Sequence, residues 1–313
     1  MAHPIWQDVI YNFNAECAEF AIIHNGAIIY EGKAYRTPGT QFIKIKINDI
    51  CADYLRNAFP NEFPDTSTEE QSYIYTFTIE ADLYNGTTVV ESVSRDVELF
   101  YDWSYSNVAQ LWLLSAPILR KIPRNAPFVC TATESVNISD SDLDVAEGKK
   151  ANIVIADIEG SAINIIGEAP DEELSYEVVD SCYRYMLYYL NAFGGWDFLL
   201  IEGKELQSDN YTRYTLGQSY DNAQYGARGA RNYRNDVVRK WQLHTLWIDN
   251  AGAQNMHHLL GSTDVYLYDL TSQELYPITL DNSVCEYKTY SNNGNQLVRY
   301  DIEATLAQTI TRR

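Results

Sequence analysis

The chain has 313 residues, of which 46% are hydrophobic and 21% charged, and its net charge is −20. This composition excludes a disordered chain, and the lack of about 18 consecutive apolar residues excludes a conventional membrane-spanning helix and membrane insertion. The acidic excess lies in residues 1–210, because residues 211–313 hold ten basic and ten acidic side chains. An acidic body repels phosphate backbones, so we expect no sequence-specific nucleic-acid binding, although the charge also serves solubility.

Residues 1–125 are predicted to form an antiparallel β-sandwich. Tyr, Ile, Val, Thr and Phe crowd into short runs, and the alternation in QFIKIKIND predicts a strand over 41–49. Two Asn-Gly pairs separate further runs of this kind and predict tight hairpins, because both residues tolerate positive φ. These pairs are Asn25-Gly26 and Asn85-Gly86. The polar, proline-containing segment 57–72 is predicted to be an excursion within this domain.

Residues 126–175 are predicted to form a small β region with an acidic loop. Two alternating runs flank Glu159-Gly160, and the loop has the sequence SDSDLDVAEGKK. Its first carboxylates have the spacing that opens a calcium-binding loop, but Val145 and Ala151 occupy the positions that need glycine and glutamate. We therefore predict a solvated loop and no metal site. These carboxylates belong to Asp140, Asp142 and Asp144.

Residues 176–313 are predicted to form a C-terminal β domain. The only helix expected in the chain follows Asp249 or Asn250 as its cap and ends at Gly261 in the left-handed conformation. The adjacent His257 and His258 point to different sides of such a helix, which does not suit zinc. The predicted strands are 180–190, 196–205, 237–248, 263–270, 275–280, 284–290 and 296–308. An Asn-Gly turn in SNNGN separates the last two.

The segment YYLNAFGGWDFLLIEGK (188–204) resembles an active-site loop, because an aspartate lies among glycines and aromatic residues. Alternation on both sides instead predicts a hairpin whose two faces are covered. Gly194 and Gly195 are predicted to supply backbone angles that only glycine adopts easily, and Asp197 to cap the turn through neighbouring amides. No partner carboxylate is defined nearby, and no nucleophile elbow, Walker loop or dinucleotide fingerprint occurs. We predict a structural corner and no enzyme activity, catalytic residue or cofactor.

The segment QYGARGARNYRNDVVRK (224–240) concentrates arginines against one aspartate. Three interpretations are open: contact with nucleic acid through phosphates and stacking, docking on an acidic surface of a neighbouring subunit, or an exposed mobile loop. The acidic body favours docking, with residues 226–236 ordered only in an assembly. The predicted interface residues are Tyr225, Arg228, Arg231 and Arg234.

Five cysteines lie far apart and include no C-x-x-C pair, which argues against a disulfide framework and a zinc knuckle. The N-terminal residues lack the basic segment and apolar run of a signal peptide. We therefore expect reduced thiols in a protein made in a cytoplasm. The cysteines are Cys17, Cys51, Cys130, Cys182 and Cys285.

Several segments together resemble virion tail proteins of phages that infect gut Bacteroidetes, with the crAss-like phages as the nearest group. They are IYEGKAYRTPG, IKIKINDICADYL, YYLNAFGGWDFLLIEGK, VVRKWQLHTLWIDNAGAQNMHHLLGSTDVYLYD and EYKTYSNNGNQLVRYDIEATLAQ. The resemblance implies a mainly β, non-enzymatic tail or collar protein, made in the host cytoplasm and located in the virion. It implies a cyclic homo-oligomer, with 6- or 12-fold symmetry expected, that contacts other tail or portal-proximal proteins.

Two functions of other classes compete with this one. Six tryptophans and 25 tyrosines suit a carbohydrate-binding β-sandwich protein, because aromatic faces stack on sugars. The 43 acidic residues leave room for the carboxylate pair of a glycoside hydrolase.

Overall fold

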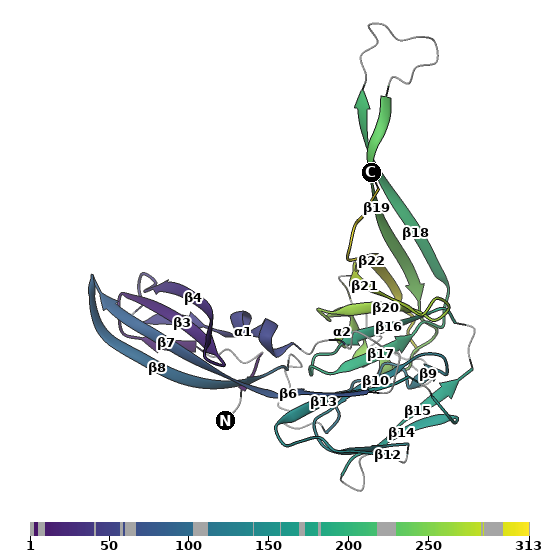
Figure 1. Cartoon of the computed structure of the whole chain (residues 1–313), viewed down its shortest axis with the longest axis horizontal. Coiled ribbons are helices and arrows are strands. Elements are labelled where there is room, and N and C mark those ends of the chain that lie inside the picture. Colours follow the sequence, from purple (N-terminus) through teal and green to yellow (C-terminus); the bar gives the residue numbers. More distant parts are fainter. Residues whose placement is uncertain are drawn as a thin grey trace.

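The structure, a computed structural model, is mainly β and confirms the predicted fold class. An N-terminal five-stranded sheet lies at one end, the 3-stranded, the second 5-stranded and the 8-stranded sheets form a larger body, and a long hairpin extends from that body (Figure 1). The residues that the structure describes are 3–5, 10–40, 42–56, 59, 67–102, 112–139, 141–156, 158–168, 173–180, 183–217, 230–282, 284 and 297–312.

The N-terminal sheet has the strand order β1-β8-β7-β3-β4. Both predicted hairpins are confirmed, with positive φ at Asn25 (51°), Gly26 (77°) and Gly86 (61°). One face of the sheet is buried and the other is polar, as the alternation of side chains along each strand requires. The strands are β1 (His3–Pro4), β3 (Cys17–His24), β4 (Ala27–Tyr35), β7 (Ile74–Asn85) and β8 (Thr88–Phe100).

A helix that the sequence analysis did not predict packs on this sheet. Helix α1 (Asn48–Leu55) buries Cys51 and Leu55, and the ring of Tyr54 meets that of Phe77 edge-on at 6.4 Å. The expectation of a single helix was therefore wrong. Helix α1 could not be recognised from the sequence, because it has no side-chain cap and is stabilised by burial. It follows β5 (Ile43–Lys46), which confirms the alternating strand and pairs with β2 (Ile10–Phe13).

The middle of the chain forms two sheets, of orders β10-β13-β6 and β12-β11-β14-β15-β9. Strand β6 comes from the end of the segment predicted as a polar excursion, and it pairs along β13. Strand β12 occupies part of the predicted acidic loop. The domain boundaries after residues 125 and 175 stay predictions. The strands are β6 (Ser67–Ser72), β9 (Lys121–Pro123), β10 (Phe128–Ala132), β11 (Val136–Ile138), β12 (Ser141–Leu143), β13 (Lys149–Ile155), β14 (Ala162–Ile166) and β15 (Glu173–Val179).

The C-terminal sheet has the order β17-β16-β20-β21-β22-β19-β18, and β23 also pairs with β19. Strand β18 was not predicted, and β19 begins at Ala230 instead of residue 237. Of the predicted strand 284–290, only Val284 is described, outside any strand, and the SNNGN turn lies outside the described residues. The strands are β16 (Tyr185–Leu190), β17 (Trp196–Leu200), β18 (Glu205–Gly217), β19 (Ala230–His244), β20 (Val265–Asp269), β21 (Glu274–Leu280), β22 (Asp301–Leu306) and β23 (Ile310–Arg312).

The predicted C-terminal helix is α2 (Asn250–Leu260). The Asp249 carboxylate accepts a hydrogen bond from the backbone N–H of Gly252 at 2.8 Å, which confirms Asp249 as the cap. Gly261 ends the helix with φ of −92°, so the expected left-handed conformation was wrong. His257 is exposed and His258 buried, as their adjacent positions predict. Burial, assisted by His257, lowers the pKa of His258 to about 4.

Candidate functional site

The β16–β17 corner is a buried hairpin, as predicted, and every residue of both strands is buried. Its turn is capped by Asn191, whose Oδ1 accepts hydrogen bonds from the backbone N–H groups of Phe193 (2.9 Å) and Gly195 (3.0 Å). The proposed cap, Asp197, does not serve the turn's amides. The turn therefore has the Asx-type cap that was predicted, but Asn191 provides it and not Asp197.

Asp197 instead forms hydrogen bonds with Ser115 and Ala116, which are distant from it in the sequence. Its carboxylate accepts hydrogen bonds from Ser115 Oγ (2.5 Å), the Ala116 N–H (2.8 Å) and Asn191 Nδ2 (2.7 Å). Burial raises the pKa of Asp197, and the three hydrogen bonds oppose that rise. The carboxylate is 3% exposed and its oxygens are occupied by donors, which suits a structural role.

Replacing Asp197 with asparagine should destabilise the protein by about 1–3 kcal/mol, because the new amide presents a donor to groups that already donate. We expect chemical denaturation to show this loss, with no effect on any binding measured for the folded protein. If D197N abolished a binding or catalytic activity while its free energy of unfolding stayed unchanged, the structural interpretation of this aspartate would be wrong.

The two corner glycines are needed for different reasons. Gly194 has φ of +83° and confirms its predicted role. Gly195 does not have positive φ, so that expectation was wrong. A Cβ at Gly195 would lie 1.9 Å from the carbonyl oxygen of Leu114, in the segment that Asp197 holds. Close backbone approach, and not an unusual dihedral angle, therefore requires glycine there.

The most prominent feature outside the body is the hairpin of β18 and β19, which we call the arm (Figure 1). Its strands pair from Glu205 with Leu243 to Gly217 with Ala230. Strands β22 and β23 support β19, whereas β18 forms the edge of the sheet. An extended edge strand presents unpaired backbone groups and is a ready contact surface.

Of the four predicted interface residues, the structure describes the side chain of Arg234 alone. Tyr225 and Arg228 lie outside the described residues, and Arg231 lies on β19 opposite Leu216 in the backbone register. The expectation that residues 226–236 order only in an assembly was wrong for the part from Ala230 onward, because pairing with β18 orders it.

The Arg234 guanidinium binds the Asp236 carboxylate through two hydrogen bonds of 2.8 Å each. The guanidinium carbon also lies 5.2 Å from the centre of the Tyr214 ring, and the centres of the Tyr214 and Tyr233 rings are 6.3 Å apart. Its carboxylate partner is thus on the same strand, where the sequence analysis had expected one on a neighbouring chain. Arg234 stiffens the arm through this ion pair and stacking.

The sequence analysis missed several exposed arm residues that a partner could contact. Tyr211, Leu216 and Tyr233 are 51%, 49% and 54% exposed. Arg213 is also exposed and forms no ion pair or hydrogen bond with any described residue. The only signal in the sequence was the mixed run YTRYTL, which lacks the clear alternation of a half-buried strand.

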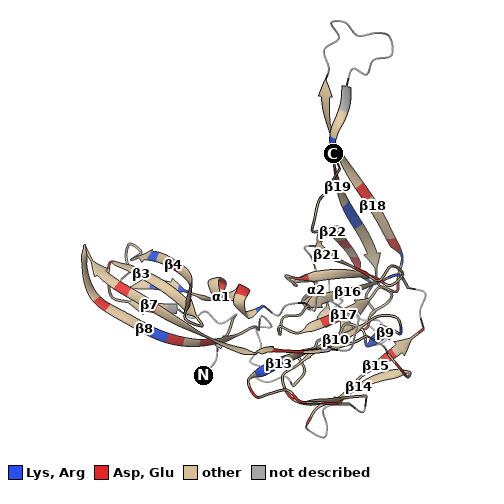
Figure 2. Ribbon diagram, in the orientation of Figure 1, with Lys and Arg blue, Asp and Glu red and all other residues tan. Residues whose placement is uncertain are grey.

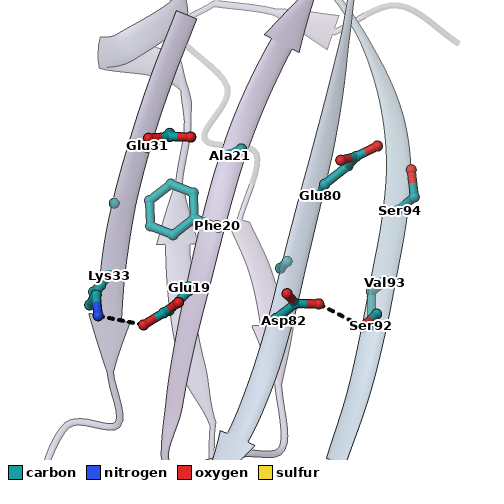
Figure 3. A pocket seen from close by; sticks show the side chains of 12 residues that line it. Glu19, Phe20, Ala21, Glu31, Lys33, Glu80, Asp82, Ser92, Val93 and Ser94 are labelled. Carbon is teal, nitrogen blue, oxygen red and sulfur yellow. Dashed lines mark hydrogen bonds and ion pairs between the residues drawn. The ribbon is translucent and has the colours of Figure 1, made fainter. Parts of the chain in front are cut away.

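A second candidate site is a groove of about 740 Å³ on the N-terminal sheet (Figure 3). It crosses strands β4, β3, β7 and β8, and its charged lining consists of four carboxylates and one amine. The lining residues are Glu19, Phe20, Ala21, Glu31, Gly32, Lys33, Glu80, Ala81, Asp82, Ser92, Val93 and Ser94.

Among the described residues, no three His, Cys, Asp or Glu side chains are close enough together to hold a metal ion. Asp142, from the tested calcium pattern, accepts a hydrogen bond from Asn137 Nδ2 at 2.7 Å, and Asp140 lies outside the described part. No described helix is long and apolar enough to cross a membrane. No protein-family model matches the sequence, and no curated protein matches it. Function is therefore argued from the arm and the groove.

Proposed function

We propose that this protein is a non-enzymatic structural component of a phage virion tail or collar, where copies of the chain form a ring near the DNA conduit. The resemblance of its segments to crAss-like phage tail proteins supports this proposal, and the arm is the observation that carries it. Beyond the pairing of β19 with β23 at Asn235–Val237, the described outer part of this stiffened hairpin pairs only with itself (Figure 1). Its exposed aromatic residues and arginines suit contact with another protein.

A ring requires heterologous contacts, in which one surface of a copy meets a different surface of the next. The arm supplies one such surface, and the acidic body supplies the other. The acidic excess of residues 1–210 also suits a position near DNA, because like charges prevent the genome from adhering. The 6- or 12-fold symmetry and the other tail or portal-proximal partners belong to this proposal.

Replacing Arg228, Arg231 and Arg234 with serine should weaken ring formation while leaving the melting temperature of the body nearly unchanged. Charge-assisted contacts at a partly wet interface depend on these cations, so added salt should weaken assembly of the wild type in the same direction. Mass photometry of the purified full chain measures the outcome directly.

Two controls make this test specific. The variant R36S/R120S/R299S removes the same charge from exposed sites away from the arm and should assemble like the wild type. The double variant R228S/R231S keeps the Arg234–Asp236 pair, so it separates lost contacts from a loosened arm. Normal rings from both arm variants would contradict a role for these arginines in assembly.

The groove favours a second candidate function, a carbohydrate-binding β-sandwich protein. Carboxylates and serine hydroxyls line it, and such groups bind sugar hydroxyls. Binding to a glycan array by a monomeric chain, abolished by E31Q/E80Q, would favour this function over assembly. Assembly into rings without glycan binding would exclude it.

A further inference from the structure

Two rows of side chains form the walls of the groove on the N-terminal sheet. In the strand register, Glu31 of β4 is opposite Ala21 of β3, and Ala21 is opposite Glu80 of β7. The small side chain of Ala21 therefore leaves space between two carboxylates (Figure 3). Because neighbouring strands are about 4.8 Å apart, these carboxylates stand on strands about 10 Å apart.

The second row consists of Lys33, Glu19, Asp82 and Ser92, and their polar groups bind one another within the sheet. Lys33 forms an ion pair with Glu19, and the Ser92 hydroxyl donates a hydrogen bond to Asp82 at 2.6 Å. Glu31 and Glu80, in contrast, form no hydrogen bond or ion pair with any described residue and are both exposed. Glu31 and Glu80 are thus the two groove carboxylates that have no partner among the described residues.

The arm shows the opposite pattern. Two of its arginines bind carboxylates of the same hairpin: Arg234 binds Asp236, and Arg239 binds Asp209 at 2.9 Å. Arg213, which lies on β18 opposite Asn235, has no such partner in the described part. Between Tyr214 and Tyr233 the sequence holds two further arginines, Arg228 and Arg231, against one acidic residue, Asp221, so the uncompensated charge of this part of the chain is positive.

The arm cannot serve its own groove, because the two lie at opposite ends of the molecule (Figure 2). We propose that the groove receives the arm of a second copy of this chain, with Arg213 between Glu31 and Glu80. The exposed Tyr211 lies two residues before Arg213 on β18, on the same face of the strand, and adds apolar contact area beside it. This inference rests on the proposed ring function and names the two surfaces that join neighbouring copies.

The contact is heterologous, since an arm meets a groove and not another arm, and its repetition gives a closed ring or an open filament. Electrostatic complementarity selects the pairing and increases the association rate. Reversal of either charge places two like charges together in every copy, because positions 80 and 213 then carry the same sign.

A charge-swap experiment tests this arrangement with the full chain. Arg213→Glu and Glu80→Arg should each weaken self-association at least about tenfold, as measured by sedimentation velocity at low salt. An equimolar mixture of R213E and E80R should assemble again, because the carboxylate at position 213 of one variant can pair with the guanidinium at position 80 of the other, and the second variant's Arg213 with the first variant's Glu80. Neither variant alone has both a matching arm and a matching groove.

The variant E91R is the matched control, because Glu91 is an exposed carboxylate of β8 that does not line the groove. It should assemble like the wild type, and all variants should show the wild-type circular dichroism spectrum and Tm. If the wild type assembles and E80R or R213E assembles equally well, the groove contact is overturned and the ring function stands. A mixture that stays dissociated also overturns it. A wild type that remains monomeric overturns both proposals.

Discussion

Replacement of Gly195 by valine is expected to lower the free energy of unfolding by about 3–5 kcal/mol. The Cβ atom alone would lie 1.9 Å from the carbonyl oxygen of Leu114 and 2.6 Å from its Cβ. Leu114 has little freedom to retreat, because its N–H donates to the Thr131 carbonyl at 2.8 Å and its carbonyl accepts from Asn191 at 2.9 Å. Urea denaturation followed by tryptophan fluorescence measures the loss.

Three alanine variants separate the causes of a glycine requirement. Gly26 has positive φ but nothing within 4 Å of a Cβ, so G26A should cost about 1 kcal/mol through backbone strain alone. Gly217 has neither constraint, and G217A should be nearly neutral. G195A should approach the valine variant in cost. A G195A variant no less stable than G26A would show that the corner relaxes around the added atom, contrary to this account.

Local features of the fold were predictable from the sequence, because their causes are local. The hairpins at Asn25 and Asn85 follow from the backbone freedom of Asn-Gly pairs, and α2 follows from the cap at Asp249. The buried β16–β17 hairpin follows from apolar runs on both sides of two glycines.

The remaining features depend on contacts that sequence spacing does not reveal. The partners of Asp197 at Ser115 and Ala116 lie about 80 residues away in the chain, so a local cap was the natural but wrong prediction. Helix α1 has a weakly helical sequence and is held by packing. Strand β18 lies on an exposed arm, where no face is buried over most of its length and alternation is lost.

In the candidate sites, too, some features were visible in the sequence and others depend on strand pairing that only the structure shows. The arginine-rich composition pointed to the arm, but the pairing of Arg234 with Asp236 could only be seen once β19 was known to begin at Ala230. The free carboxylates of the groove, Glu31 and Glu80, are 49 residues apart, and the register of three strands brings them together. Without that register, neither is distinguishable from the other acidic residues.

Lys150 is a basic side chain that the fold buries within the body. It lies on β13, the central strand of its sheet, and is 2% exposed. Burial lowers the pKa of Lys150 to about 8 from its ordinary value of 10.5. No described carboxylate forms an ion pair with it. A charged amine in this position destabilises the folded state.

The sign of the pH dependence follows from this shift. Between pH 8 and 10.5 the unfolded chain binds the Lys150 proton more tightly than the folded chain does, so this group's penalty is complete below about pH 8 and disappears as the pH rises to 10.5. The difference in pKa corresponds to about 3 kcal/mol at neutral pH. Replacement by methionine keeps the stem and removes the charge, so K150M should be more stable than the wild type by about that amount at pH 7.

At pH 10 the advantage of K150M should shrink to less than about 1 kcal/mol, because the amine is then neutral in the folded state and the unfolded chain binds its proton only weakly. Denaturation of both proteins at the two pH values measures it, and other titrating groups cancel in the difference. Lys149 is the matched control, because it is the next residue on β13 and its Nζ donates to Ser72 Oγ at 3.2 Å near the surface. K149M should change stability little at either pH. A gain for K150M that does not depend on pH would mean that better packing, and not removal of a buried charge, is its cause.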